Sequence, residues 1–184
     1  MNSPRIGPLP VEDWDQESLE LLNRMNFAAD QPPPNILATM ARHPKLLKRW
    51  LVLTNHFMMK CRLPSRDREL LILRTGYRCR APYEWGQHVI LARSAGLTEA
   101  EIRRVIDGPQ AEGWAEFDAA LLTAADELHD GSSITDSTWS VLAGRYDDQQ
   151  LLEVPLLVGQ YHGVSYALNS WRTPLDIGVE GFPP

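Results

Sequence analysis

Residues 63–102, LPSRDRELLILRTGYRCRAPYEWGQHVILARSAGLTEAEI, decide the fold of this chain. Apolar residues recur at helical spacing through Leu70–Tyr77, which predicts a helix over 66–79. Pro82 suits the first turn of a second helix, because its missing N–H costs nothing there, and this helix should extend over 82–95. The link between them is so short that the two helices must pack antiparallel.

The rest of the chain also favours helices, since strand-like alternation is scarce. The sequence therefore predicts an all-α protein built around the central antiparallel pair. Residues 1–34 are proline-rich and should form an arm with one short helix near residues 15–25, while residues 35–184 should form the helical domain. The remaining helices are expected near residues 35–53, in two segments before and after His43-Pro44, and near 98–108, 115–129, 136–145 and 149–171.

Composition restricts the classes of function. With 184 residues, 43% of them hydrophobic and 23% charged, the chain has the make-up of one soluble domain. Its formal net charge of -6 argues against nucleic acid as a partner. The N-terminus lacks the apolar core of a secretory signal, and no apolar run approaches the ~20 residues that cross a bilayer. We therefore expect no membrane association and a cytoplasmic location.

The ionisable side chains within residues 63–102 suggest chemistry. Glu84 and His88 lie four residues apart on the second predicted helix, so their side chains share one face. A carboxylate beside an imidazole can transfer protons near neutral pH, although such pairs also occur at solvated surfaces. Glu69 on the first helix is offset from His88 by roughly 6 Å along the axis at a rise of about 1.5 Å per residue. A buried glutamate beside a second carboxylate should have a raised pKa.

Three spaced elements of this segment carry a resemblance to a known family. They are Leu-Pro-x-x-x-Arg-Glu-Leu at its start, Tyr-Glu-Trp-x-x-His in its middle and Gly-Leu-Thr-x-x-Glu-Ile at its end. Together with Val158–Tyr161, they resemble the carboxymuconolactone decarboxylase family, which includes the AhpD-like proteins. The resemblance covers most residues from about Asn35 to Asp176. It implies an AhpD-like helical bundle that assembles as a homo-oligomer, a trimer or a hexamer.

The resemblance also raises the question of whether this chain could use the family's redox mechanism. AhpD-like peroxidases carry a Glu followed by Cys-x-x-Cys-x-x-x-His, and their two thiols reduce peroxide. Counting back from His88, the two cysteine positions hold Ala81 and Glu84, while Glu69 occupies the position of the upstream Glu. The dithiol mechanism, and the peroxidase or peroxiredoxin label that goes with it, therefore do not transfer directly.

Candidate site residues follow from both arguments. We predict His88, Glu84 and Glu69 as the catalytic residues. The predicted substrate-binding residues are Tyr83, Trp85, Tyr161 and Arg80. Arg78 and Arg80 would attract an anionic small molecule. We expect no cofactor, and no metal either, because neither the histidines nor the two cysteines have the spacing of a metal site.

Three functions remain open. The first is a cofactor-free acid/base enzyme of the decarboxylase or lyase type, acting on a small organic acid or a lactone through His88 and Glu84. The second is a peroxidase or antioxidant protein that uses Cys79, which would need an external thiol because Cys61 lies a whole helix away in sequence. The third is a non-catalytic oligomeric binding protein that keeps the fold and its pocket.

Overall fold

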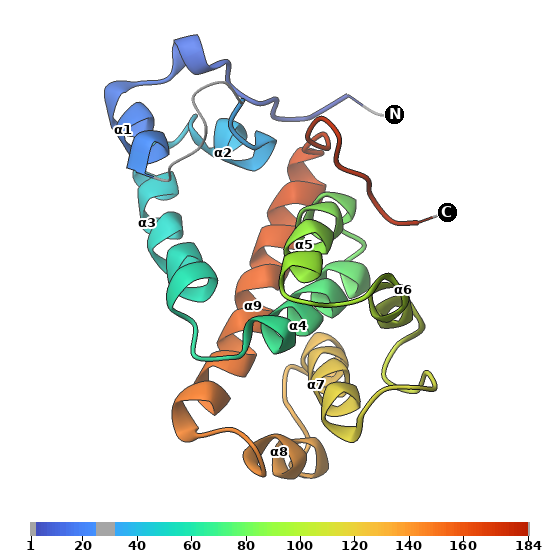
Figure 1. Ribbon diagram of the computed structural model, residues 1–184. Helices are drawn as coiled ribbons and strands as arrows, with labels where there is room; N and C mark the ends of the chain where they lie inside the picture. Colours follow the sequence, from blue (N-terminus) through green and yellow to red (C-terminus); the bar gives the residue numbers. More distant parts are fainter. Residues whose placement is uncertain (1–2, 25–31, 184) are drawn as a thin grey trace.

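The first predicted helix is α4 (Ser65–Arg78) in the computed structural model, which describes residues 3–24 and 32–183 (Figure 1). Residues 70–73 of α4 are 0–1% exposed, so this helix is covered on all sides at its middle. It packs against α5 (Pro82–Ser94), α6 (Glu99–Asp107), α7 (Glu116–Gly131) and α9 (Asp148–Trp171). The antiparallel pair of α4 and α5 is thus the centre of the fold, as predicted.

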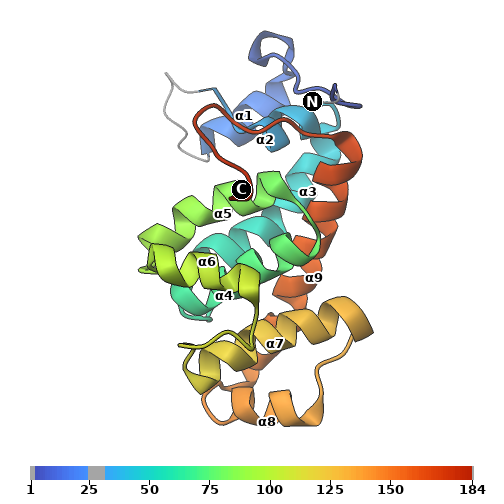
Figure 2. The same ribbon diagram turned by 90° about the vertical axis from the view of Figure 1, so that its right-hand side faces the viewer.

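The other described elements surround this pair. They are the 3-10 helix η1 (Val11–Asp13), α1 (Gln16–Arg24), α2 (Asn35–Met40), α3 (Pro44–Asn55), the π-helical turn η2 (His56–Lys60) and α8 (Asp136–Ala143). Figures 1 and 2 show α1–α3 gathered at one end of the molecule, α7 and α8 at the other, and α9 running between the two ends. Within the described residues there are nine α-helices and no strand, which confirms the all-α prediction.

Local sequence signals explain where several helices begin. Pro82 stands at the first position of α5, as predicted. Thr98 caps α6 through a capping box with Glu101, in which each side chain binds the other residue's backbone N–H. Asp147 and Gln150 form a second capping box at the start of α9. These caps set the directions of α6 and α9 relative to the central pair.

The N-terminal arm packs onto the helical domain. The backbone N–H of Arg5 donates to the carbonyl of Trp171, and that of Leu9 donates to the carbonyl of Ala38. Trp14 is buried in a second apolar cluster with residues of α2 and α3. Helix α1 lies inside the predicted arm, whose residues 1–2 and 25–31 fall outside the described part of the chain. The division of the chain at residue 34 stays a prediction.

The C-terminal segment returns across α5 and closes the fold. Figure 2 shows it running between α5 and the end formed by α1 and α2. A Cβ atom at Gly86 would overlap the backbone oxygen of Glu180, so only glycine allows this close approach. None of the helices in the described ranges is both long and apolar enough to span a membrane.

Candidate functional site

The turn between α4 and α5 brings the predicted catalytic residues together. The backbone N–H of Ala81 donates to the carbonyl of Gly76 at 2.9 Å, which folds α5 back along α4. As a result, Nδ1 of His88 lies 2.7 Å from Oε2 of Glu69. The axial offset inferred from the sequence is bridged directly by the long Glu69 side chain.

The central imidazole is held from both sides. Nε2 of His88 lies 2.9 Å from Oε1 of Glu84, one helical turn away on α5. Arg68 completes the row, because its Nε and Nη2 lie 2.9 and 2.8 Å from Oε1 of Glu69. Glu69, Glu84 and His88 are 0%, 4% and 5% exposed, so this is a buried ion network and not a solvated surface pair.

The network shifts the pKa values of its members. Burial alone would lower the pKa of His88, but the charges of Glu69 and Glu84 outweigh it and raise that pKa to about 10. Burial would likewise raise the pKa of Glu69, yet the positive charges of His88 and Arg68 leave it below its ordinary value. Our expectation of a raised pKa is therefore wrong for Glu69, because cations face it from two sides.

A cavity of about 210 Å³ opens against Glu84 and His88. Its walls are mainly apolar and come from α2, α3, η2, α5 and α9. The residues that line it are Pro34, Ile36, Leu37, Trp50, Leu51, Thr54, Met58, Tyr83, Glu84, Gln87, His88, Leu91, Gln160, Tyr161 and Val164. Glu84 and His88 are the only charged side chains among them. The chemistry of this cavity is therefore set by one carboxylate and one imidazolium in apolar surroundings.

Tyr161 of α9 lines the same cavity. Its ring meets the His88 ring edge-on, with centroids 4.9 Å apart. Its hydroxyl donates only a weak hydrogen bond, 3.6 Å to Sδ of Met58. Burial and the nearby carboxylates hold the pKa of Tyr161 well above its usual range, so the hydroxyl keeps its proton as a hydrogen-bond donor.

Tyr83 also lines the cavity, although its hydroxyl is already engaged. That hydroxyl donates to Oδ2 of Asp176 at 2.8 Å and accepts from the backbone N–H of Ile36 at 3.2 Å. Gln87 donates to the same Asp176 oxygen at 2.6 Å. Tyr83 thus supports the cavity wall and joins it to the C-terminal segment.

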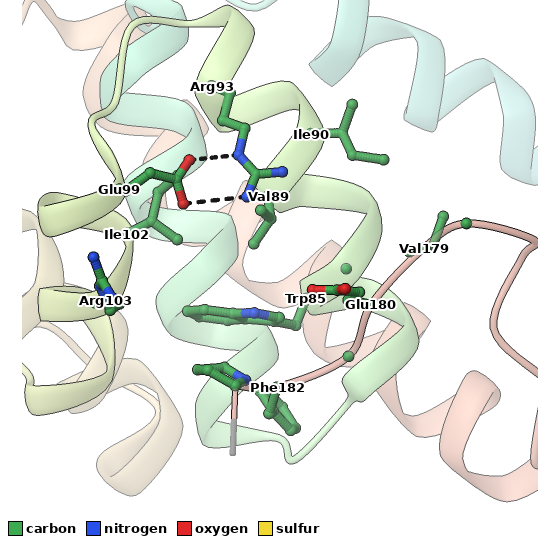
Figure 3. A pocket seen from close by; sticks show the side chains of 14 residues that line it. Trp85, Val89, Ile90, Arg93, Glu99, Ile102, Arg103, Val179, Glu180 and Phe182 are labelled. Carbon is green, nitrogen blue, oxygen red and sulfur yellow. Dashed lines mark hydrogen bonds and ion pairs between the residues drawn. The ribbon is translucent and has the colours of Figure 1, made fainter.

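Trp85 lies on a different face of α5 from Glu84. Its ring packs beside Tyr77 and Phe182, at centroid distances of 6.1 and 5.5 Å. There it lines a different and larger hollow of about 720 Å³, which Figure 3 shows with the ion pair between Arg93 and Glu99. The structure does not bring Trp85 to the predicted substrate site, because neighbouring residues on a helix point about 100° apart.

Arg80 does not reach the cavity either. It occupies the turn after α4 with φ 51°, a left-handed conformation, and its side chain is exposed. It lines a separate hollow with Tyr77, Arg78, His129 and Phe182. Arg78 itself pairs with Asp126 and Asp130. Neither arginine therefore supplies the cavity with a positive charge.

Cys79 lies outside this site in its own surroundings. Its sulfur is 4.0 Å from Nδ1 of His129 on α7. Burial raises the pKa of the Cys79 thiol, which disfavours the thiolate that peroxide reduction needs. Cys61 is also a free thiol; burial and its contact with Glu153 raise its pKa to about 12.

Comparison with known proteins shows which family part of the chain resembles. A sequence model of the carboxymuconolactone decarboxylase family matches residues 44–127, which include both helices of the central pair. This part of the chain is similar to the carboxymuconolactone decarboxylase family. No curated protein matches the sequence.

Solved structures share the AhpD-like fold at low identity. The alkylhydroperoxidase AhpD core protein of Ralstonia eutropha JMP134 has a TM-score of 0.77 at 15% identity, covering 95% of each chain. A peroxidase-related protein of Silicibacter sp. TM1040 has a TM-score of 0.74 at 16% identity, covering 96% of this chain and 91% of that one. The debrominase Bmp8, in complex with 2,3,4-tribromopyrrole, has a TM-score of 0.72 at 14% identity, covering 96% and 94%.

Two residues that support the site, Arg68 and Asp176, were not identified from the sequence. Arg68 neighbours Glu69 in sequence, and its guanidinium also donates to the carbonyl of Met58, so it ties η2 to the network. The position of this basic residue next to the motif glutamate could have predicted its contact with Glu69. Asp176 lies about 90 residues from its partners Tyr83 and Gln87. Nothing in the local sequence predicts that contact.

Proposed function

We propose that this protein is an acid/base catalyst that moves a proton on a compact, uncharged carbonyl compound such as a lactone, without a cofactor. The observation that carries this proposal is the buried row Glu69–His88–Glu84, whose outer carboxylate borders an apolar cavity. Carboxylates in apolar surroundings serve as the general base in several cofactor-free enzymes.

The pKa of His88 indicates which residue acts as the base and which residues only balance charge. At a pKa of about 10 the imidazole is protonated at neutral pH, and both of its nitrogens face carboxylates. It therefore has no lone pair for a substrate, and Glu84 is the better candidate for the base. The imidazolium then balances the charge of Glu84, while Glu69 and Arg68 hold the imidazolium in place.

The proton-transfer step balances without another reactant. A proton on the carbon beside the carbonyl group passes to the second oxygen of Glu84, which accepts no hydrogen bond from the described residues. The C–H electron pair becomes part of an enolate, whose oxygen accepts a hydrogen bond from the Tyr161 hydroxyl. Return of the proton to the same or a conjugated carbon gives exchange or isomerisation and restores the carboxylate.

Charge favours an uncharged substrate over an anion. Arg68, Glu69, His88 and Glu84 carry +1, -1, +1 and -1, which sum to zero, and the described residues that line the cavity include no Lys or Arg. An anionic substrate would meet the Glu84 carboxylate beside an imidazolium whose charge is already balanced by Glu69 and Glu84. The debrominase Bmp8, which has a similar fold, binds 2,3,4-tribromopyrrole, a compact ring compound. A lactone therefore suits this cavity better than a small organic acid.

Hydrogen–deuterium exchange tests the proposal directly. Unsaturated lactones and cyclic ketones are incubated with the protein in D₂O, and exchange beside the carbonyl is followed by NMR. We expect Glu84→Gln to slow exchange by about 100-fold or more, since positioned proton transfer contributes roughly 10²–10⁴. The matched control is Glu116→Gln at the exposed start of α7, which should exchange at the wild-type rate.

The outcomes separate the three functions. Exchange that survives Glu84→Gln would refute the proposed base. A compound that binds in the cavity without exchange or turnover would favour a binding protein. Hydroperoxide consumption with excess dithiol that Cys79→Ser abolishes would establish a one-cysteine peroxidase, against which the raised pKa of Cys79 argues.

We further propose that the chain forms a homo-oligomer, a trimer or a hexamer. Large apolar side chains are exposed on α3 and α9, among them Val52, Leu152 and Leu156 at 70%, 66% and 63%. Such side chains are typical of surfaces that a second copy covers. Light scattering coupled to size exclusion gives the mass, and a monomer at micromolar concentration would contradict this proposal.

A further inference from the structure

Three side chains of the kind that bind transition metals meet away from the cavity. Cys79 follows α4, His129 lies in the last turn of α7, and His162 lies in the middle of α9. Nδ1 of His129 is 2.9 Å from Nε2 of His162 and 4.0 Å from the Cys79 sulfur. All three atoms lie within 4.8 Å of one another. Spacing along the chain gave no sign of this cluster, because each residue comes from a different helix.

The tautomer of His162 suits a ligand. Its Nδ1 lies 2.9 Å from the backbone carbonyl of Val158, which can only accept a hydrogen bond. Nδ1 therefore carries a proton, and in the neutral ring Nε2 presents its lone pair toward His129. Metal-binding histidines commonly donate their other ring N–H to a backbone carbonyl in this way, which fixes the ring and directs the free nitrogen.

We propose that Cys79, His129 and His162 bind a divalent transition-metal ion, with Zn²⁺ the best match. Thiolate and imidazole ligands suit zinc, whereas Ca²⁺ and Mg²⁺ prefer oxygen. Tetrahedral Zn–N bonds of about 2.0–2.1 Å and a Zn–S bond of about 2.3 Å place the two nitrogens about 3.3 Å apart and a sulfur and nitrogen about 3.6 Å apart. The observed separations of 2.9 and 4.0 Å, and a third within 4.8 Å, need side-chain adjustments of up to about 1 Å to fit.

The surrounding structure holds the three helices in position. Asn169 of α9 donates to the carbonyl of Cys79 at 2.9 Å, which joins the end of α4 to α9. The positive charge of nearby Arg78 is balanced by Asp126 and Asp130, at 2.9 and 2.6 Å. His129 also lines the hollow that contains Arg80, so one of the three proposed ligands borders a surface opening. Three protein ligands leave the fourth tetrahedral position to water.

This site is independent of the proposed acid/base function, because it uses none of the residues that line the cavity. A bound ion would connect the ends of α4 and α7 to the middle of α9. The competing explanation is a plain hydrogen bond between the two histidines, with Cys79 as a neighbouring thiol. The two explanations differ in whether a metal forms a bond to the Cys79 sulfur.

Cobalt titration of the full-length, chelator-treated protein distinguishes them. Co²⁺ bound to a thiolate in a tetrahedral site gives a near-ultraviolet charge-transfer band and strong visible bands, which Zn²⁺ then displaces. We expect one equivalent to bind the wild-type protein, with a higher melting temperature in Zn²⁺. Cys79→Ser should lose the charge-transfer band and at least about 100-fold in affinity, since even outer partners of a metal contribute 10–100-fold.

Matched controls keep the result specific to the cluster. Cys61→Ser removes the other free thiol and should bind Co²⁺ as the wild type does. If Cys79→Ser does not fold, judged by circular dichroism, His129→Asn takes its place and should weaken binding similarly. A folded wild-type protein without the charge-transfer band would overturn the proposal, as would a band that Cys61→Ser abolishes and Cys79→Ser leaves unchanged.

Discussion

Helix α5 separates two hollows that differ in size and in chemistry. On one face, Glu84, His88 and Leu91 border a cavity of about 210 Å³. On the other face, Trp85 and Arg93 border a hollow of about 720 Å³. The larger hollow contains an ion pair between Arg93 and Glu99 whose side chains are 54% and 58% exposed, whereas the smaller one contains a buried ion network.

The comparison shows why volume alone is a poor guide to a site. An exposed ion pair stabilises the fold little, because water screens it. A buried row of charges interacts more strongly, since low dielectric strengthens every interaction within it. Substitutions on the two faces of α5 should therefore have unequal effects.

The largest difference is expected for the two ion pairs. Glu69→Gln leaves Arg68 and His88 without their buried anion, and the free energy of unfolding should fall by about 3–5 kcal/mol. Glu99→Gln removes the partner of Arg93 in the other hollow and should have no measurable effect. Urea denaturation monitored by circular dichroism measures both variants. Equal losses would remove the distinction between the two faces.

The charge of His88 should be visible in the pH dependence of stability. Its folded pKa of about 10 lies above the ordinary value of 6.5, so its contribution is complete below pH 6.5 and is lost as the pH rises toward 10. The contribution is a few kcal/mol in order of magnitude, at about 1.4 kcal/mol per pKa unit. NMR titration of the His88 ring checks the assignment, and a ring that titrates near 6.5 would contradict it.

A smaller effect is expected where the C-terminal segment crosses α5. Gly86→Ala places a methyl group on the backbone of Glu180, and we expect a loss of about 1–3 kcal/mol together with changed Trp85 fluorescence. Gly159→Ala in α9 has nothing within 4 Å of the added carbon. That control should gain about 0.5–1 kcal/mol from helix propensity. Thermal denaturation compares them, and similar melting temperatures would mean that the segment is not held at Gly86.

The smallest effect concerns the cavity wall. Tyr83→Phe removes a hydroxyl that joins Asp176 and the N–H of Ile36, at a cost of about 1 kcal/mol. Arg80→Ala, on the exposed turn, should leave both stability and binding of a lactone in the cavity within error of the wild type. Calorimetry with a compound that shows exchange measures binding. Weaker binding by the Arg80→Ala variant would show that Arg80 contributes to the substrate site after all.

The sequence by itself determined the helices and the proximity of Glu69, Glu84 and His88. Residues within one helix or across one tight turn have nearly fixed relative positions. For that reason Pro82, the spacing of Glu84 and His88, and the place of Glu69 on the preceding helix predicted the central pair and its acidic and basic groups. The same spacing excluded the dithiol motif, because Ala81 and Glu84 occupy the cysteine positions.

Only the tertiary structure decided which residues surround Glu69, Glu84 and His88. It turned Tyr161 toward His88 and Trp85 away from it, and it placed Asp176 against Tyr83. It also gathered Cys79, His129 and His162 from three helices. These contacts depend on how the helices rotate and cross when the whole core packs. Local periodicity identifies the apolar face of a helix, but it does not say which neighbour will cover that face.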